Sequence, residues 1–63
     1  MTTITLRQGP TAWLATTTGD GAAEIIDLFG TDTIETAFDR YAPAAMVLAE
    51  ITRLNPDATI TLA

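Results

Sequence analysis

The side chains best suited to chemistry in this sequence are its eight carboxylates, because the chain contains neither histidine nor cysteine. Glu24 and Asp27 stand three residues apart and Glu35 and Asp39 stand four apart, so each pair would share a face of a helix. Carboxylate pairs can bind a hard cation such as calcium or magnesium. However, the surrounding residues do not supply the alternating oxygen ligands of an EF-hand loop. We therefore interpret the carboxylates as a solvated acidic face and predict no metal site.

The missing residue types also exclude most forms of catalysis. Histidine is the commonest general base and cysteine the strongest natural nucleophile, and both are usual zinc ligands. The Gly19-Asp20-Gly21 segment has neither the spacing nor the lysine of a phosphate-binding loop, so it predicts a turn. The sequence therefore predicts a protein that is not an enzyme, with no catalytic residues and no cofactor.

The charge balance limits the choice of partner. The formal net charge is −5, and the only basic side chains are Arg7, Arg40 and Arg53. Nucleic acids and anionic membranes are bound by clustered lysine and arginine, so we expect neither as a partner. A partner attracted by charge would be a basic protein. Solubility alone is the alternative explanation for the acidity.

With 63 residues, the chain forms one domain, residues 1–63. A chain of this length buries only ~60% of the surface of its unfolded form, and it has no disulfide to compensate. We therefore expect self-association, as a homodimer. No segment reaches the ~18 apolar residues of a membrane span, and residues 1–10 lack the features of a signal peptide. The expected location is the cytoplasm.

Five large side chains are candidates for an interface with a partner: Trp13, Phe29, Phe38, Tyr41 and Met46. Tryptophan is enriched at binding hot spots, but of the two interpretations of Trp13 we favour the largest part of a small core. Tyr41 and Met46 could belong to one exposed apolar patch.

Period-two alternation predicts strands at both ends of the chain. Residues Thr2–Gln8 place threonines on one face and isoleucine and leucine on the other, and a Gly-Pro turn joins them to a second strand, Thr11–Thr18. The segment Ala58–Ala63 repeats the Thr-Ile-Thr-Leu pattern of the first strand, so the two could share a sheet. Arrays of threonine can form flat binding surfaces, but nothing repeats beyond four residues, so solvated β-formers are the better interpretation.

A helix is predicted after Pro43, which suits a first helical position. Apolar residues at helical spacing form a stripe made of Ala44, Val47, Leu48, Ile51 and Leu54. Glu50 and Arg53 could pair on the far side. The Asn55-Pro56-Asp57 segment ends this helix.

Residues 22–42 allow two interpretations. The segment 22–30 could be a short helix closed by Gly30, or a third strand. Asp32 and Glu35 have capping-box spacing, which indicates a helix over about Thr33–Tyr41. Of these we favour a strand followed by a helix. The predicted fold is α+β: a small antiparallel-type sheet, built from the N-terminal hairpin, the C-terminal strand and optionally a middle strand, packed on one main helix.

Two segments resemble the core of HicB-like antitoxins: Trp13-Leu14-Ala15 and the run Gly30-Thr31-Asp32-Thr33-Ile34-Glu35-Thr36-Ala37-Phe38. In that family a similar run leads into the long helix. The resemblance implies a role in binding and blocking a small basic toxin. We accordingly expect a non-enzymatic protein–protein interaction or regulatory module, of the antitoxin or inhibitor type. The alternative is a structural subunit that associates only with itself.

Overall fold

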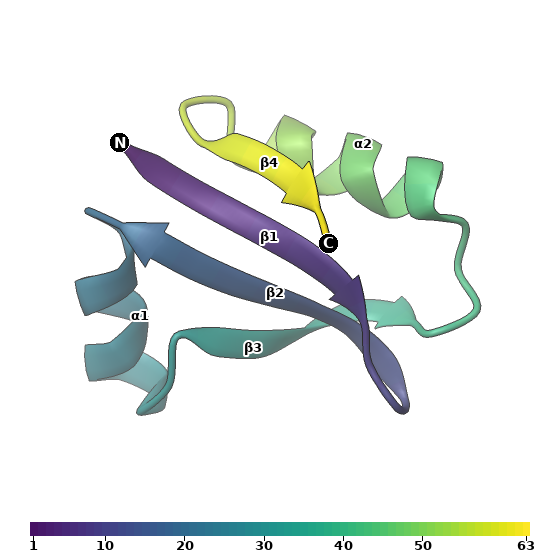
Figure 1. Cartoon of the computed structure of the whole chain (residues 1–63), viewed down its shortest axis with the longest axis horizontal. Coiled ribbons are helices and arrows are strands. Elements are labelled where there is room, and N and C mark those ends of the chain that lie inside the picture. Colours follow the sequence, from purple (N-terminus) through teal and green to yellow (C-terminus); the bar gives the residue numbers. More distant parts are fainter.

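The computed structural model describes residues 1–63. In chain order its elements are β1 (Thr2–Gln8), β2 (Ala12–Gly19), α1 (Ala22–Phe29), β3 (Thr33–Asp39), α2 (Ala44–Leu54) and β4 (Thr59–Leu62) (Figure 1). The strands form one sheet in the order β3-β2-β1-β4, so the predicted α+β class is confirmed. Only β4 runs parallel to its neighbour, which makes the sheet mixed. Parallel pairing requires a crossover connection, and here the path from β1 to β4 includes α2.

The repeated Thr-Ile-Thr-Leu pattern pairs with itself across β1 and β4. Ile4 lies opposite Ile60 and Leu6 lies opposite Leu62, with the threonines in register between them. Because side chains alternate along a strand, the apolar residues of both strands point to one face and the threonines to the other. The predicted shared sheet is therefore confirmed.

The core lies on the face that carries the helices. Its buried residues are Ile4, Leu6, Trp13, Ala15 and Val47. The indole Nε1 of Trp13 donates a hydrogen bond to the carbonyl oxygen of Ala42 over 3.0 Å, which satisfies the polar edge of this large side chain. The predicted helix from Pro43 is confirmed as α2, and Val47 is its fully buried residue. Neither helix is long and apolar enough to cross a membrane.

Residues 22–42 adopt the reverse of the favoured order, and that prediction is wrong: α1 comes first and β3 follows. α1 ends at Gly30, whose φ of 77° is left-handed and whose N–H donates to the carbonyl of Ile26 over 2.7 Å. Glycine adopts this conformation without steric cost, so it ends the helix efficiently.

The segment predicted as a second helix forms β3 instead. Thr33 pairs with Thr16 and Ile34 pairs with Ala15, so β3 completes the exposed side of the hairpin. The spacing of Asp32 and Glu35 indicated a helical cap, but β-branched residues and cross-strand pairing favour the extended form. The run that carries the HicB-like resemblance therefore lies in a loop and a strand, not at the start of a helix.

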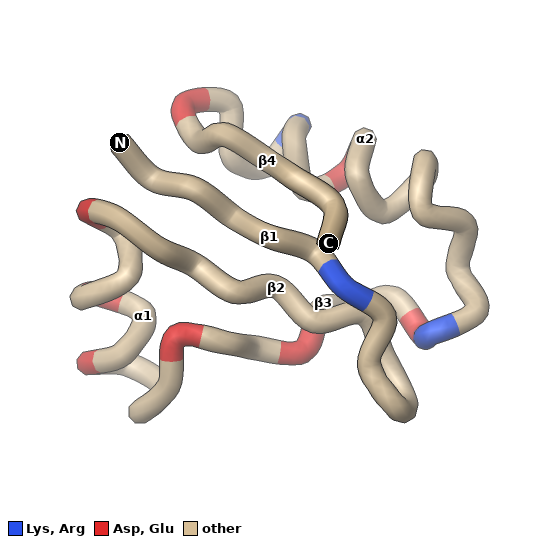
Figure 2. The backbone as a smooth tube through the Cα atoms, viewed as in Figure 1, with Lys and Arg blue, Asp and Glu red and all other residues tan.

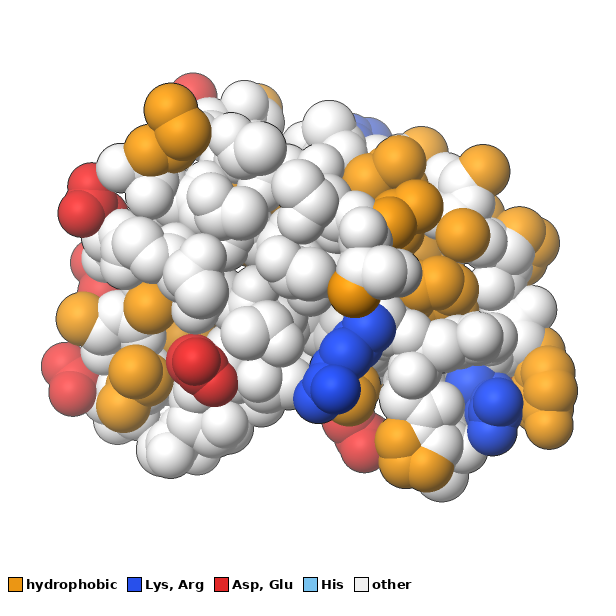
Figure 3. All heavy atoms as spheres, in the orientation of Figure 1, with side chains coloured by type: hydrophobic (Ala, Val, Ile, Leu, Met, Phe, Trp, Pro, Cys, Tyr) orange, Lys and Arg blue, Asp and Glu red, His pale blue; other side chains and the backbone are white.

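Threonines gather on the sheet face that carries no helix. One row crosses all four strands through Thr33, Thr16, Thr5 and Thr61. Within it, the hydroxyls of Thr5 and Thr61 lie 3.1 Å apart and those of Thr16 and Thr33 lie 3.0 Å apart. The middle of the face turned to the viewer in Figure 3 is correspondingly neither hydrophobic nor charged.

Candidate binding groove

Helix α1 is amphipathic yet contains no buried residue. Ile26, Leu28 and Phe29 keep 46%, 76% and 55% of their surface exposed. A helix of eight residues is marginal in water and depends on tertiary packing of its apolar side. In Figure 1, α1 lies beside the end of β2, far from α2. Its apolar surface is therefore only partly used within one chain.

Helix α2 covers the part of the sheet formed by β1 and β4, and α1 sits at the opposite side of the same face. Between them the structure leaves an open groove of about 610 Å³, called here the α1–α2 groove. It is lined by Thr2, Ile4, Ala15, Thr17, Gly21, Glu24, Ile25, Ile34, Thr36, Ala37, Phe38, Glu50, Ile51, Leu54 and Asn55.

The lining of the α1–α2 groove combines apolar side chains from the sheet and both helices with threonines and two carboxylates. Ile4 and Ala15 come from the core strands, and Ile34 comes from β3. α1 contributes a carboxylate, Glu24, and α2 contributes Glu50. Binding sites commonly combine such an apolar surface with a few polar groups that orient the ligand.

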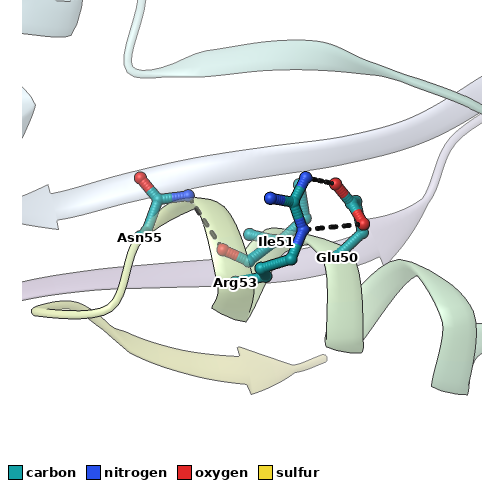
Figure 4. A network of polar contacts seen from close by, with 4 residues as sticks. All are labelled: Glu50, Ile51, Arg53 and Asn55. Atoms are coloured by element: carbon teal, nitrogen blue, oxygen red, sulfur yellow. Dashed lines mark hydrogen bonds and ion pairs between the residues drawn. The ribbon is translucent and has the colours of Figure 1, made fainter.

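A small polar network fixes the α2 wall (Figure 4). Arg53 donates from its guanidinium to both carboxylate oxygens of Glu50, with 3.3 Å between Nε and Oε2. This hydrogen bond lowers the pKa of Glu50 and raises the pKa of Arg53, and mutual attraction adds to both shifts. Asn55 closes the helix by donating from Nδ2 to the carbonyl of Ile51 over 2.9 Å. The charge of Glu50 is thus already compensated, whereas that of Glu24 is not.

Charge is unevenly distributed around the groove. Between Arg7 and Arg40 the sequence has six carboxylates and no basic residue. Of these, only Asp20 forms an ion pair, with the amino group of Met1 over 2.9 Å. Figure 2 shows acidic positions along α1 and at the start of β3, and basic positions away from α1 on the other side of the molecule. The α1 side of the groove therefore carries an uncompensated negative potential. No three of the carboxylates gather closely enough to hold a metal ion.

The structure does not bring the five candidate interface residues together. Trp13 is 7% exposed and belongs to the core, in agreement with the favoured interpretation of this residue. Phe38 is half-buried and lines the α1–α2 groove. Phe29 is exposed on α1, and Tyr41 and Met46 are exposed near the start of α2.

Sequence reasoning did not identify most of the groove. Ile25 lay in the segment that was assigned to a strand, and Ile34 lay in the segment that was assigned to a helix. Ile51 and Leu54 belong to the apolar stripe that the sequence indicates for this helix.

No known family, curated protein or solved structure compared with this chain matches it.

Proposed function

We propose that this chain is a protein-binding module that receives a basic amphipathic helix of another protein in the α1–α2 groove. The observation that carries the proposal is the open groove between the two helices, whose lining includes the half-buried side chains of Ile25, Ile34 and Ile51. A sheet with one apolar face is stable when that face is buried against another layer. Here Ile4 and Ala15 are buried, but Ile34 beside them is only half-buried and lines an open groove between the two helices.

A helix suits the shape of this opening better than an extended peptide does. The groove lies on the face of the sheet, so a bound strand could not pair with the backbone of β1 or β2, each of which has a neighbour on both sides. A helix satisfies its own backbone hydrogen bonds and can present apolar side chains at i, i+3, i+4 and i+7 to the floor. Bound beside α2, it would complete the helical layer.

The charges around the groove favour a basic partner. Glu24 lines the groove without an ion-pair partner, and Asp27 lies on the same short helix. Lysine or arginine on the polar side of a bound helix would reach these carboxylates. A second copy of the chain would instead bring another acidic surface to this place, which is unfavourable at a net charge of −5 per chain.

Binding of this kind would mask one helix of the partner, which suits the regulation or neutralisation of a basic protein. The HicB-like resemblance implies the same kind of role. Both the antitoxin-like role and the basic partner belong to this proposal.

The test uses two designed peptides of about four helical turns, ~14 residues each. Both carry leucine on one side, and the polar side is lysine in one peptide and glutamate in the other. Binding is measured by isothermal titration calorimetry, and nuclear magnetic resonance shift changes locate the site. We expect the lysine peptide to bind with shifts at Ile25, Ile34 and Ile51, and the glutamate peptide not to bind.

Two matched variants separate the groove from general charge effects. Leu54→Lys places a charge at the groove wall, whereas Leu28→Lys makes the same substitution outside it. Both leucines are more than half exposed, so neither change removes core packing. We expect Leu54→Lys to weaken binding at least about tenfold, or ~1.4 kcal/mol, and Leu28→Lys to weaken it less than about threefold. Equal effects of the two variants, or no binding of the lysine peptide, would refute the proposal.

A further inference from the structure

The outer edge of β4 presents backbone groups that no strand of this chain pairs with. The N–H of Ala63 donates to the carbonyl of Leu6 over 2.9 Å, which fixes the direction in which each β4 residue points its backbone. In a strand, the N–H and C=O groups of one residue point to the same side, and those of the next residue point to the opposite side. Thr61 and Ala63 therefore face β1, and Ile60 and Leu62 point their N–H and C=O groups away from the sheet. β4 is an end strand, so nothing lies on that side in the sheet order.

The two edges of the sheet differ in how well they are protected against pairing. β3 carries exposed carboxylates at Glu35 and Asp39, and its pairing with β2 is interrupted by a bulge. Charges and bulges are the usual means by which proteins block an edge. β4 has no charged residue, no proline and no bulge over Thr59–Leu62. β4 is short, but of the two edges it alone carries neither a charge nor a bulge.

We propose that two copies of this chain form a homodimer by pairing their β4 edges in antiparallel orientation, with Ile60 opposite Leu62 of the partner subunit. Each such pair exchanges both of its outward backbone hydrogen bonds, so the groups left free in one chain are satisfied. The result is one continuous sheet across both copies. This surface is separate from the α1–α2 groove, so the homodimer does not depend on the proposed function.

The side chains are compatible with this register, whereas a shift of the register by one residue would place apolar residues opposite threonines. Opposed residues of a sheet point to the same face. Ile60 and Leu62 both belong to the helix-bearing face, and Thr61 meets Thr61 of the partner subunit on the threonine face. The threonine row then continues through both copies. Asp57 precedes the strand and lies opposite no residue of the other β4, so like charges are kept apart.

Exposed apolar surface near β4 adds to the same interface. Leu62 is 46% exposed although it points to the core side of the sheet. Figure 3 shows hydrophobic side chains gathered beside the end of β4, over α2. Pairing of the edges would cover Leu62 with the corresponding strand of the second copy.

Native mass spectrometry and sedimentation equilibrium of the 63-residue chain give its mass over a range of concentrations. We expect twice the 6.7 kDa of one chain. Leu62→Pro removes an outward N–H and leaves the bonds to β1 intact, and proline is tolerated at such an edge position. It should weaken the dimer at least tenfold. Leu62→Ala keeps the N–H and controls for the lost side chain, so it should dimerise more tightly than the proline variant. Circular dichroism confirms that both variants are folded.

The register is tested by cross-linking, because the chain has no cysteine of its own. In the proposed pair the Cβ atoms at position 61 come about 4.5–5.5 Å apart. Thr61→Cys should therefore oxidise to a covalent dimer at least tenfold faster than Thr18→Cys, which lies on the same sheet face but on β2. A wild-type chain that stays monomeric would overturn the proposal. So would a dimer that cross-links equally at both positions, or one that Leu62→Pro leaves unchanged.

Discussion

Truncation of two core side chains should measure whether the α1–α2 groove is open in solution. Leu6 and Ile4 lie two residues apart on the same face of β1, but only Ile4 lines the groove. Leu6→Ala leaves a closed cavity, because Leu6 has no exposed surface. Ile4→Ala leaves a cavity that merges with the groove, so neighbouring side chains and water can adjust to it. Leu28→Ala, at a position 76% exposed, serves as the control.

The magnitudes follow from these environments. Truncation of a fully enclosed leucine to alanine lowers the free energy of unfolding by about 3–5 kcal/mol, and truncation at a site open to a groove should lower it by only ~2 kcal/mol. The control should change stability by less than ~0.5 kcal/mol. At ~0.05–0.15 kcal/mol per residue, a chain of this size has about 3–9 kcal/mol in total, so Leu6→Ala should be close to unfolded.

Urea unfolding, followed by the fluorescence of Trp13 and by far-ultraviolet circular dichroism, gives the three free energies. Trp13 is the only tryptophan and lies in the core, so its emission reports on the region of both truncated residues. For Leu6→Ala, an osmolyte such as trimethylamine oxide restores enough folded protein to measure a transition. If Ile4→Ala costs as much as Leu6→Ala, the groove is closed in solution and the reasoning behind the proposed function fails.

Three further predictions concern the helices and turns. Gly30→Ala should lower the free energy of unfolding by about 1–2 kcal/mol, because the left-handed backbone at this position is strained for alanine even though the space around it is open. Gly19→Ala should lower it clearly more, because the added Cβ would also meet the carbonyl oxygen of Met1; urea unfolding midpoints compare the two variants. Hydrogen bonding from Arg53 lowers the pKa of Glu50, so the pair should stabilise the fold at pH values above 4.5, the ordinary pKa of this carboxyl group. This stabilisation should be lost as the pH falls through the lowered pKa, and Glu50→Gln should remove that pH dependence in thermal melts. The amide protons of α1 should exchange faster than those of β1 and β2 in hydrogen-exchange measurements, because α1 has no buried residue, and equal protection would show that α1 is covered in solution.

Much of the sheet and the main helix could be predicted because their patterns are locally consistent. β1 alternates along its whole length, and the apolar stripe of α2 begins at Ala44, directly after Pro43, and ends before Pro56. In each of these elements the local preference and the tertiary environment favour the same structure. The pairing of β1 with β4 followed from the same alternation.

The middle of the chain was mispredicted because its local signals compete. Ile34, Ala37 and Phe38 fit a helix, while Ile34, Thr36 and Phe38 fit a strand with one half-buried face. The choice depends on the open side of β2, which supplies pairing partners for β3. Such cross-strand partners are distant in sequence, so no local pattern reports them.

By itself the sequence determined that the chain is acidic, that it lacks histidine and cysteine, and where the elements with an unambiguous hydrophobic period lie. Only the tertiary structure decided that α1 and β3 occupy residues 22–39, that an open groove lies between the two helices, and that β4 is an edge strand without a charge or a bulge. The physical reason is that composition and periodicity are local properties. A groove or a free strand edge depends on how segments distant in the sequence pack, and on which surfaces that packing leaves uncovered.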